Sequence, residues 1–109
     1  MINPQGATLQ MEGCITMGLG YALAEEVRFR DGQVLDTNFD TYEIPRFSWL
    51  PKIETVLVEN PSLPPKGGGE PAIICMGGVL ATAVYDAVGA KVLQLPMTSE
   101  RVKEALKRA

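Results

Sequence analysis

The chain contains no histidine, and this absence excludes more chemistry than any other feature of its composition. A Ser–His or Cys–His nucleophile pair, a histidine-based zinc site and an imidazole acid–base group all require a residue that the 109-residue chain lacks. The two cysteines, Cys14 and Cys75, are too few for an iron–sulfur cluster or a structural zinc site. Each lies in an apolar stretch, where cysteine usually serves as a small core residue, so we expect free thiols and a reducing compartment.

Long apolar runs and clusters of positive charge are also missing. Glu12, Glu25 and Asp86 interrupt the most apolar stretches, so none reaches the ~18 residues of a membrane span. The net charge of −3, without a basic cluster, argues against nucleic acid or an anionic membrane as partner. No basic region precedes an apolar one at the N-terminus. We therefore expect a cytoplasmic location, or a periplasmic one if an export signal lies on sequence further upstream.

The patterns that are present predict an α+β fold in a single domain, residues 1–109. Apolar residues at helical spacing predict a long helix from Thr8 to Ala24. Alternation on both sides of Asp31-Gly32 predicts a hairpin over residues 26–35. The other expected elements are a strand at Ile53–Glu59 buried on both faces, a loop at 60–71, a buried helix at Ala72–Val88 ended by Gly89, a strand at Lys91–Leu95 and a C-terminal helix capped by Thr98 or Ser99.

Two helix surfaces indicate that the chain is a piece of something larger or an obligate oligomer. Gly13, Gly18 and Gly20 lie inside the first expected helix, where each glycine costs about 0.5–1 kcal/mol relative to alanine. Close approach by another backbone explains such a cost, and so does close approach by a bound ligand. The helix at Ala72–Val88 is apolar almost all round, which requires a body larger than this chain easily provides.

The segment from Lys66 to Pro71, with sequence KGGGEP, is the candidate functional site. Three consecutive glycines are costly in conformational entropy, and a chain accepts that cost where the backbone must take unusual dihedrals or let a ligand come within contact distance. Glu70 follows them at the expected start of a helix, where a carboxylate beside apolar surface can act as a general base. The alternative is a flexible linker, with Glu70 a favourable acidic residue at a helix start. A phosphate-binding P-loop is excluded, because Lys66 precedes the glycines and no Ser or Thr follows them.

Five motifs occur along the chain in a fixed order. They are Asn3-Pro4 with Gln10-Met11-Glu12-Gly13, Gly18-Leu19-Gly20-Tyr21-Ala22-Leu23 with Glu25-Glu26, Tyr42-Glu43-Ile44-Pro45, Gly67-Gly68-Gly69-Glu70-Pro71, and Leu95-Pro96-Met97-Thr98. Together they resemble the C-terminal part of the molybdenum-binding subunit of the xanthine dehydrogenase and aldehyde oxidase family, particularly subunits of the isoquinoline 1-oxidoreductase and nicotinate dehydrogenase type. The chain departs from that pattern at Cys14, Met17 and Ala72.

This resemblance implies that the chain is part of a molybdenum hydroxylase, which adds water-derived oxygen to an aldehyde or an N-heterocyclic aromatic carbon. Glu70 matches the family's general base, and Gln10 matches its glutamine beside the pterin. Gly67, Gly68 and Gly69 match the backbone that lets the molybdenum centre approach. No residue of this chain is expected to ligate the metal. The implied cofactor is molybdopterin, in its cytosine dinucleotide form.

The resemblance also implies partners. These are the remainder of the molybdenum-binding subunit, an iron–sulfur subunit, an electron-transfer partner and a small-molecule substrate. The chain alone would then bind no cofactor and show no activity. The alternative is a non-catalytic structural domain derived from such an enzyme, whose apolar helix surfaces serve self-association. A non-catalytic module has no need of an intact loop at residues 67–71, so the sequence favours the enzyme.

Overall fold

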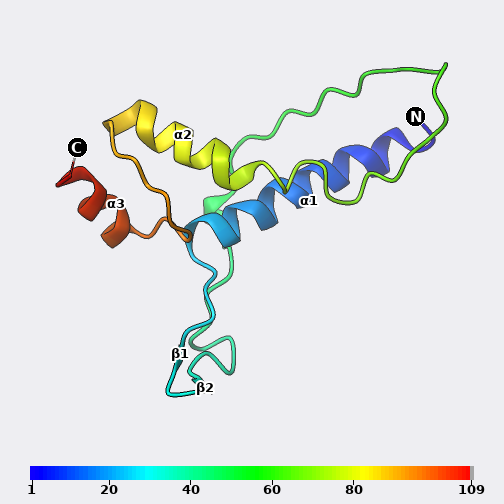
Figure 1. Ribbon diagram of the computed structural model, residues 1–109. Helices are drawn as coiled ribbons and strands as arrows, with labels where there is room; N and C mark the ends of the chain where they lie inside the picture. Colours follow the sequence, from blue (N-terminus) through cyan, green and yellow to red (C-terminus); the bar gives the residue numbers. More distant parts are fainter. Residues whose placement is uncertain (109) are drawn as a thin grey trace.

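Residues 1–108 are described by a computed structural model and fold into three helices, one short 3-10 helix and one hairpin (Figure 1). The elements are α1 (Pro4–Leu23), β1 (Phe29–Arg30), β2 (Gln33–Val34), the 3-10 helix η1 (Phe47–Trp49), α2 (Met76–Val88) and α3 (Ser99–Leu106). The expected α+β class is confirmed. α2 lies against the second half of α1, while the hairpin and a long extended segment project away from them.

α1 begins four residues before the position that the apolar spacing predicts, because the chain supplies a capping residue there. The Asn3 side chain accepts a hydrogen bond from the Gly6 amide at 2.9 Å. Pro4 occupies the first helical position, where its missing N–H is not needed. The buried residues of α1 are Cys14, Gly18, Leu19, Gly20 and Ala22. This chain therefore covers mainly the second half of the helix.

The hairpin forms at the expected turn, but its strands are only two residues long. Asp31 and Gly32 have φ of 51° and 76°, the positive values that an Asp-Gly turn favours. At the open end of the hairpin, the Asp36 carboxylate accepts one hydrogen bond from the Arg28 backbone amide at 2.6 Å and another from the Arg28 guanidinium at 2.6 Å. The Asp36 side chain is fully covered, whereas that of Arg28 is 58% exposed. The hydrogen bonds from the Arg28 side chain and amide lower the pKa of Asp36 to about 2.

α2 begins at Met76, so the prediction of a helix from Ala72 is wrong at its start. Turns occupy the residues between Pro71 and Cys75. Gly89, with φ of 73°, ends the helix as expected. Met76 is the buried residue of α2, so residues 1–108 do not themselves provide the burial that the sequence assigns to a larger body. The apolar faces of α2 are therefore open to a partner outside this stretch of chain.

The two further strands expected from sequence are wrong for residues 1–108, where β1 and β2 are the strands present. Residues 53–59 are extended, yet Val56 and Val58 are 86% and 83% exposed. A strand needs a neighbour to accept its backbone hydrogen bonds, and the described chain brings none to this segment. Residues 91–95 are also irregular, and a cis peptide bond joins Leu95 to Pro96.

A small core lies where the end of α1 meets the approach to α3. Ala22, Val92 and Met97 are buried together, and the Met97 amide donates to the Ala22 carbonyl at 2.6 Å. Thr98, one of the two predicted caps, caps α3 by accepting the Arg101 amide. None of the helices in residues 1–108 is long and apolar enough to cross a membrane.

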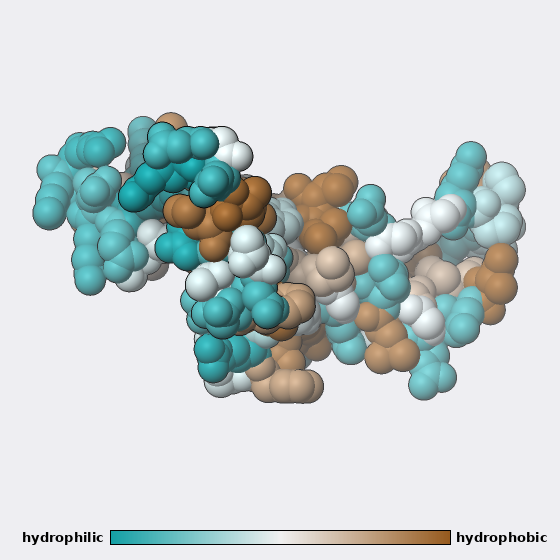
Figure 2. Space-filling model, turned by 90° about the horizontal axis from the view of Figure 1, so that it is seen from below, coloured by the Kyte–Doolittle hydropathy of each residue, from teal (hydrophilic) through white to brown (hydrophobic). Residues whose placement is uncertain are grey.

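The molecule is extended and leaves much apolar surface uncovered. Its radius of gyration is 17.1 Å, against about 13 Å for a compact domain of roughly 100 residues. Large apolar side chains such as Phe47 and Leu93 are 93% and 95% exposed. Figure 2 shows apolar patches on the visible face, both in the centre and along the part that extends to the right. This surface agrees with the expectation that the chain needs a partner.

The Arg28–Asp36 pair predicts a pH-dependent contribution to stability. The folded pKa of Asp36, about 2, lies below its ordinary value of 3.8. The contribution is therefore complete above pH 3.8 and is lost as pH falls through about 2. We expect Asp36→Asn to lower the thermal midpoint of the full protein at pH 7, and this difference from wild type to shrink between pH 4 and pH 2. Asp31→Asn, at the turn, is the control, and a difference that stays constant with pH would contradict the assignment.

Candidate functional site

One face of α1 holds the glycine-rich loop and the start of α2. Gln10, Cys14, Gly18 and Tyr21 follow one another at intervals of four, four and three residues, the spacing that places side chains on one helix face. Each of the four contacts a residue between Gly69 and Gly77. We call these four residues the α1 stripe.

The first half of the stripe binds the end of the glycine run. The Gln10 amide Nε2 donates to the Gly69 carbonyl oxygen at 2.6 Å. The Cys14 thiol donates to the same oxygen at 3.1 Å. Two donors from successive turns of α1 therefore hold the peptide bond between Gly69 and Glu70.

The second half of the stripe binds the segment after Glu70. The Tyr21 hydroxyl donates to the Ile73 carbonyl at 2.7 Å and accepts from the Gly77 amide at 3.0 Å. One turn earlier, Gly18 lets the two chains meet. A Cβ built on Gly18 would overlap Cγ of Met76 and lie 2.6 Å from its Cβ. At Gly18, close packing is therefore the explanation for a helical glycine.

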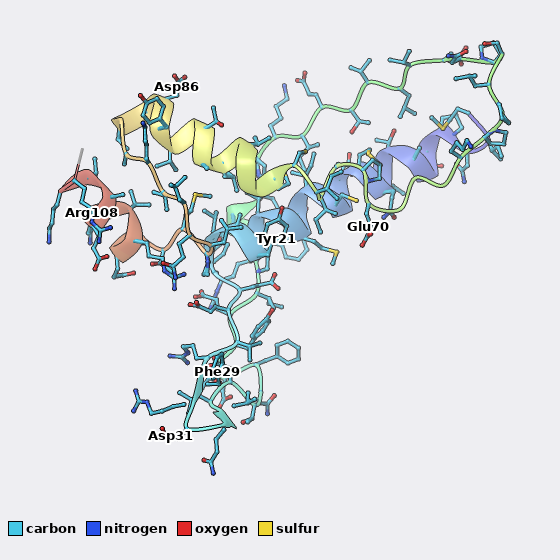
Figure 3. All side chains as sticks on the ribbon, in the orientation of Figure 1. Tyr21, Phe29, Asp31, Glu70, Asp86 and Arg108 are labelled. Atoms are coloured by element: carbon cyan, nitrogen blue, oxygen red, sulfur yellow. The ribbon has the colours of Figure 1, made fainter. Side chains whose placement is uncertain are left out.

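Glu70 lies between these two attachments, and not at a helix start as the sequence predicts. α2 begins only at Met76, and Glu70 instead opens a turn in which its carbonyl accepts the Ile73 amide at 3.2 Å. Its side chain is exposed, and its carboxylate forms no ion pair with any residue in 1–108. In Figure 3, Glu70 lies on the segment that returns beside α1, and Tyr21 lies where α1 and α2 meet.

The three glycines before Glu70 are open to the outside. Gly67, Gly68 and Gly69 have no φ in the left-handed region, and a Cβ built on any of them meets no atom of residues 1–108 within 4 Å. Neither an unusual dihedral nor contact with the described chain accounts for them. The glycine run is therefore explained either by close approach of a group from outside or by a flexible linker.

A hollow of about 840 Å³ leads to these glycines. It lies between the N-terminal half of α1 and the extended chain that runs out and back beside it. Its lining includes Gln10, Gly68, Gly69, Pro71, Met11, Leu57 and Leu63. Gln10, Gly68, Gly69 and Pro71 thus share one open surface, whereas Gly67 and Glu70 are not among its lining residues.

The composition of this surface fits a molybdopterin cofactor that carries its own metal. No group of three Cys, Asp or Glu side chains in residues 1–108 could hold a metal ion. The surface offers the exposed Gln10 amide and the backbone of Gly68 and Gly69, and the exposed Glu70 carboxylate follows directly in the chain. These groups can hydrogen-bond to a cofactor, admit it closely and accept a proton.

Comparison with known proteins decides the family. Residues 1–51 match the molybdopterin cofactor-binding domain. A nicotinate dehydrogenase subunit of Pseudomonas putida is 34% identical over 106 residues, which cover 97% of this chain and 9% of the relative. A probable xanthine dehydrogenase subunit of Bacillus subtilis is 35% identical over 112 residues, which cover 99% of this chain and 15% of the relative. The structure of quinoline 2-oxidoreductase from Pseudomonas putida 86 has a TM-score of 0.82 at 30% identity, covering 98% of this chain and 15% of that one.

The chain belongs to the xanthine dehydrogenase and aldehyde oxidase family of molybdenum-binding subunits. It spans about a seventh or less of the length of the relatives that it matches. The resemblance drawn from five motifs is thereby confirmed. The roles of Gln10, Gly67, Gly68, Gly69 and Glu70 remain predictions, which the geometry above makes specific.

Two parts of the site were not singled out from the sequence. Tyr21 was noted only within a motif, and Cys14 only as a departure from the family pattern and a core residue. The signal that could have found them is their spacing from Gln10, which places all three on one face of α1. The apolar spacing that predicts the helix does not by itself reveal this face.

The glycines of α1 provide a test of the packing. We expect Gly18→Ala to destabilise the full protein by about 1–3 kcal/mol, because Met76 contacts Gly18 through atoms near its own backbone that cannot swing away. Gly13→Ala is the matched control, since a Cβ at Gly13 meets no atom of residues 1–108 within 4 Å. It should stabilise α1 by up to about 1 kcal/mol. The thermal midpoints of both variants test this difference in stability. Equal shifts in the two variants would contradict close packing at Gly18.

Proposed function

We propose that the full protein containing this chain is a molybdenum hydroxylase with Glu70 as its general base. One observation carries the proposal most directly. The Glu70 carboxylate is exposed and free of ion pairs with residues 1–108, while the backbone on both sides of it is hydrogen-bonded to α1. A general base needs both properties, since it must be available to a proton and held in a defined place.

The residues around Glu70 have distinct roles in this proposal. When bound, molybdopterin supplies the two-electron oxidation of the substrate carbon. The Gln10 side chain hydrogen-bonds to the cofactor through its amide, and Gly67, Gly68 and Gly69 let the cofactor come within contact distance of the backbone. A Glu70 carboxylate oxygen accepts the proton that is released as water-derived oxygen is added to the carbon.

The relatives suggest the substrate class. Those whose names refer to nicotinate, xanthine and quinoline point to an N-heterocyclic aromatic substrate, and the aldehyde oxidoreductase subunit PaoC of Escherichia coli points to an aldehyde. We propose the cytosine dinucleotide form of the cofactor and a cytoplasmic location. From the family resemblance we also propose that electrons leave through an iron–sulfur subunit and a further electron carrier, in agreement with the two cysteines of this chain, which are too few for a cluster.

The proposal includes inactivity of residues 1–109 alone. The exposed apolar faces of α2 and of the extended segment would be covered by the remainder of the molybdenum-binding subunit, which also encloses the cofactor. A tagged form of this chain should therefore co-purify from its host with molybdenum and a larger polypeptide, or as part of a longer form of itself. A clean self-oligomer without metal would overturn the proposal and favour the self-association domain.

Glu70→Gln tests the base directly, because glutamine keeps the size of the side chain and cannot accept the proton. In the full assembly we expect turnover to fall by about 10²–10⁴-fold, the range for loss of a general base. Molybdenum content should stay at the wild-type level. Glu59→Gln is the matched control, since Glu59 is another exposed carboxylate without an ion pair among residues 1–108.

Near-normal turnover of the Glu70→Gln enzyme, with its cofactor still bound, would rule out the assigned role. Loss of turnover together with loss of molybdenum would also contradict it, because Glu70 would then be needed for cofactor retention instead of proton transfer. An equal loss in the Glu59→Gln enzyme would show that the effect is not specific to this loop.

A further inference from the structure

The Tyr21 hydroxyl joins three parts of the molecule at one point. It belongs to α1, donates to the Ile73 carbonyl at 2.7 Å and accepts from the Gly77 amide at 3.0 Å. Gly77 is the second residue of α2, so its amide has no acceptor within that helix. The hydroxyl of one helix therefore completes the start of another, and it uses both its proton and a lone pair.

This arrangement reaches Glu70 through a single turn. Ile73, whose carbonyl Tyr21 holds, donates its own amide to the Glu70 carbonyl at 3.2 Å. On the other side of Glu70, the Cys14 thiol and the Gln10 amide hold the Gly69 carbonyl. The backbone of Glu70 is thus fixed before and after the residue by side chains of one rigid helix.

We propose that Tyr21 is a positioning residue for Glu70, with Cys14 as its counterpart on the other side. This inference rests on the proposed function of Glu70 as the base. Tyr21 does not touch the reacting atoms; it fixes the turn between Glu70 and Ile73, and thereby the direction in which the carboxylate projects. The hydrogen bonds matter because the glycines before Glu70 provide no restraint of their own.

The size of the expected effect follows from the geometry that proton transfer needs. A base must lie within hydrogen-bond reach of the proton that it accepts, and a misplacement of about 1 Å can reduce the rate about 100-fold. Loss of the Tyr21 hydroxyl frees the Ile73 carbonyl and the Gly77 amide but keeps the ring in its place between α1 and α2. The turn would then shift without a general loss of packing.

Tyr21→Phe in the full assembly is the primary test. We expect kcat to fall by about 10- to 100-fold, with KM and molybdenum content close to wild type. Tyr85→Phe is the matched control: it makes the same substitution on α2, at a half-exposed ring over which the Lys91 amine lies at 5.9 Å. An unchanged kcat in Tyr21→Phe would overturn the proposal, as would an equal loss in Tyr85→Phe.

A double-mutant cycle separates positioning from a merely structural role. If Tyr21 acts through Glu70, Tyr21→Phe should reduce turnover strongly in the wild-type background and less than about threefold in the Glu70→Gln background. Equal fold-losses in both backgrounds would overturn the proposal, because Tyr21 would then act independently of the base. If Glu70→Gln itself leaves turnover unchanged, the proposed function fails first, and the cycle distinguishes that outcome from failure of the positioning role.

Cys14 provides a second test, which does not depend on how well Tyr21→Phe folds. Cys14→Ala removes one of the two donors to the Gly69 carbonyl, whereas Cys14→Ser keeps a donor of similar size. We expect a loss of kcat in Cys14→Ala that is largely restored in Cys14→Ser. Equal loss in both variants would contradict a role for this hydrogen bond in holding Glu70.

Discussion

The hydrogen bonds from the α1 stripe to the backbone between Gly69 and Gly77 hold the candidate site together. They join segments that are more than fifty residues apart in the chain, along a face of α1 that runs from Gln10 to Tyr21, where α1 and α2 meet. Gly18 makes this possible by letting Met76 come against the helix. Without these contacts the glycine run would be an unrestrained loop, and Glu70 would have no defined place. The site thus depends on one face of one helix.

The stripe also explains how a chain with so small a core can present a defined carboxylate. Buried apolar contacts are concentrated around Ala22, Val92 and Met97, away from the glycine run. At Glu70 itself, directed hydrogen bonds to backbone carbonyls provide the order that packing does not. The exposed apolar faces of α2 and of the extended segment are consistent with the short share of its relatives that the chain represents. Hydrogen bonds order the loop, whereas much apolar surface remains uncovered in residues 1–108.

Several local features could be predicted because they depend on neighbours in sequence. The Asp31-Gly32 turn, the end of α2 at Gly89 and the Thr98 cap of α3 all form where expected. The expected strand at residues 53–59 did not form, because a strand depends on a partner and the described chain offers none. The start of α2 was placed too early for a related reason. Its first turn is completed by Tyr21, a residue from another helix that no local pattern around Ala72 could reveal.

The sequence by itself determined the family, through five motifs in order, and with it the candidates Gln10, Gly67, Gly68, Gly69 and Glu70. It did so because those residue types carry chemistry that can be recognised without coordinates. Only the tertiary structure decided that Glu70 lies in a turn and not at a helix start, and that Cys14 and Tyr21 hold it from both sides. The physical reason is that hydrogen bonds between α1 and a loop more than fifty residues later depend on distance in space. Nothing in the local sequence of either segment contains that distance.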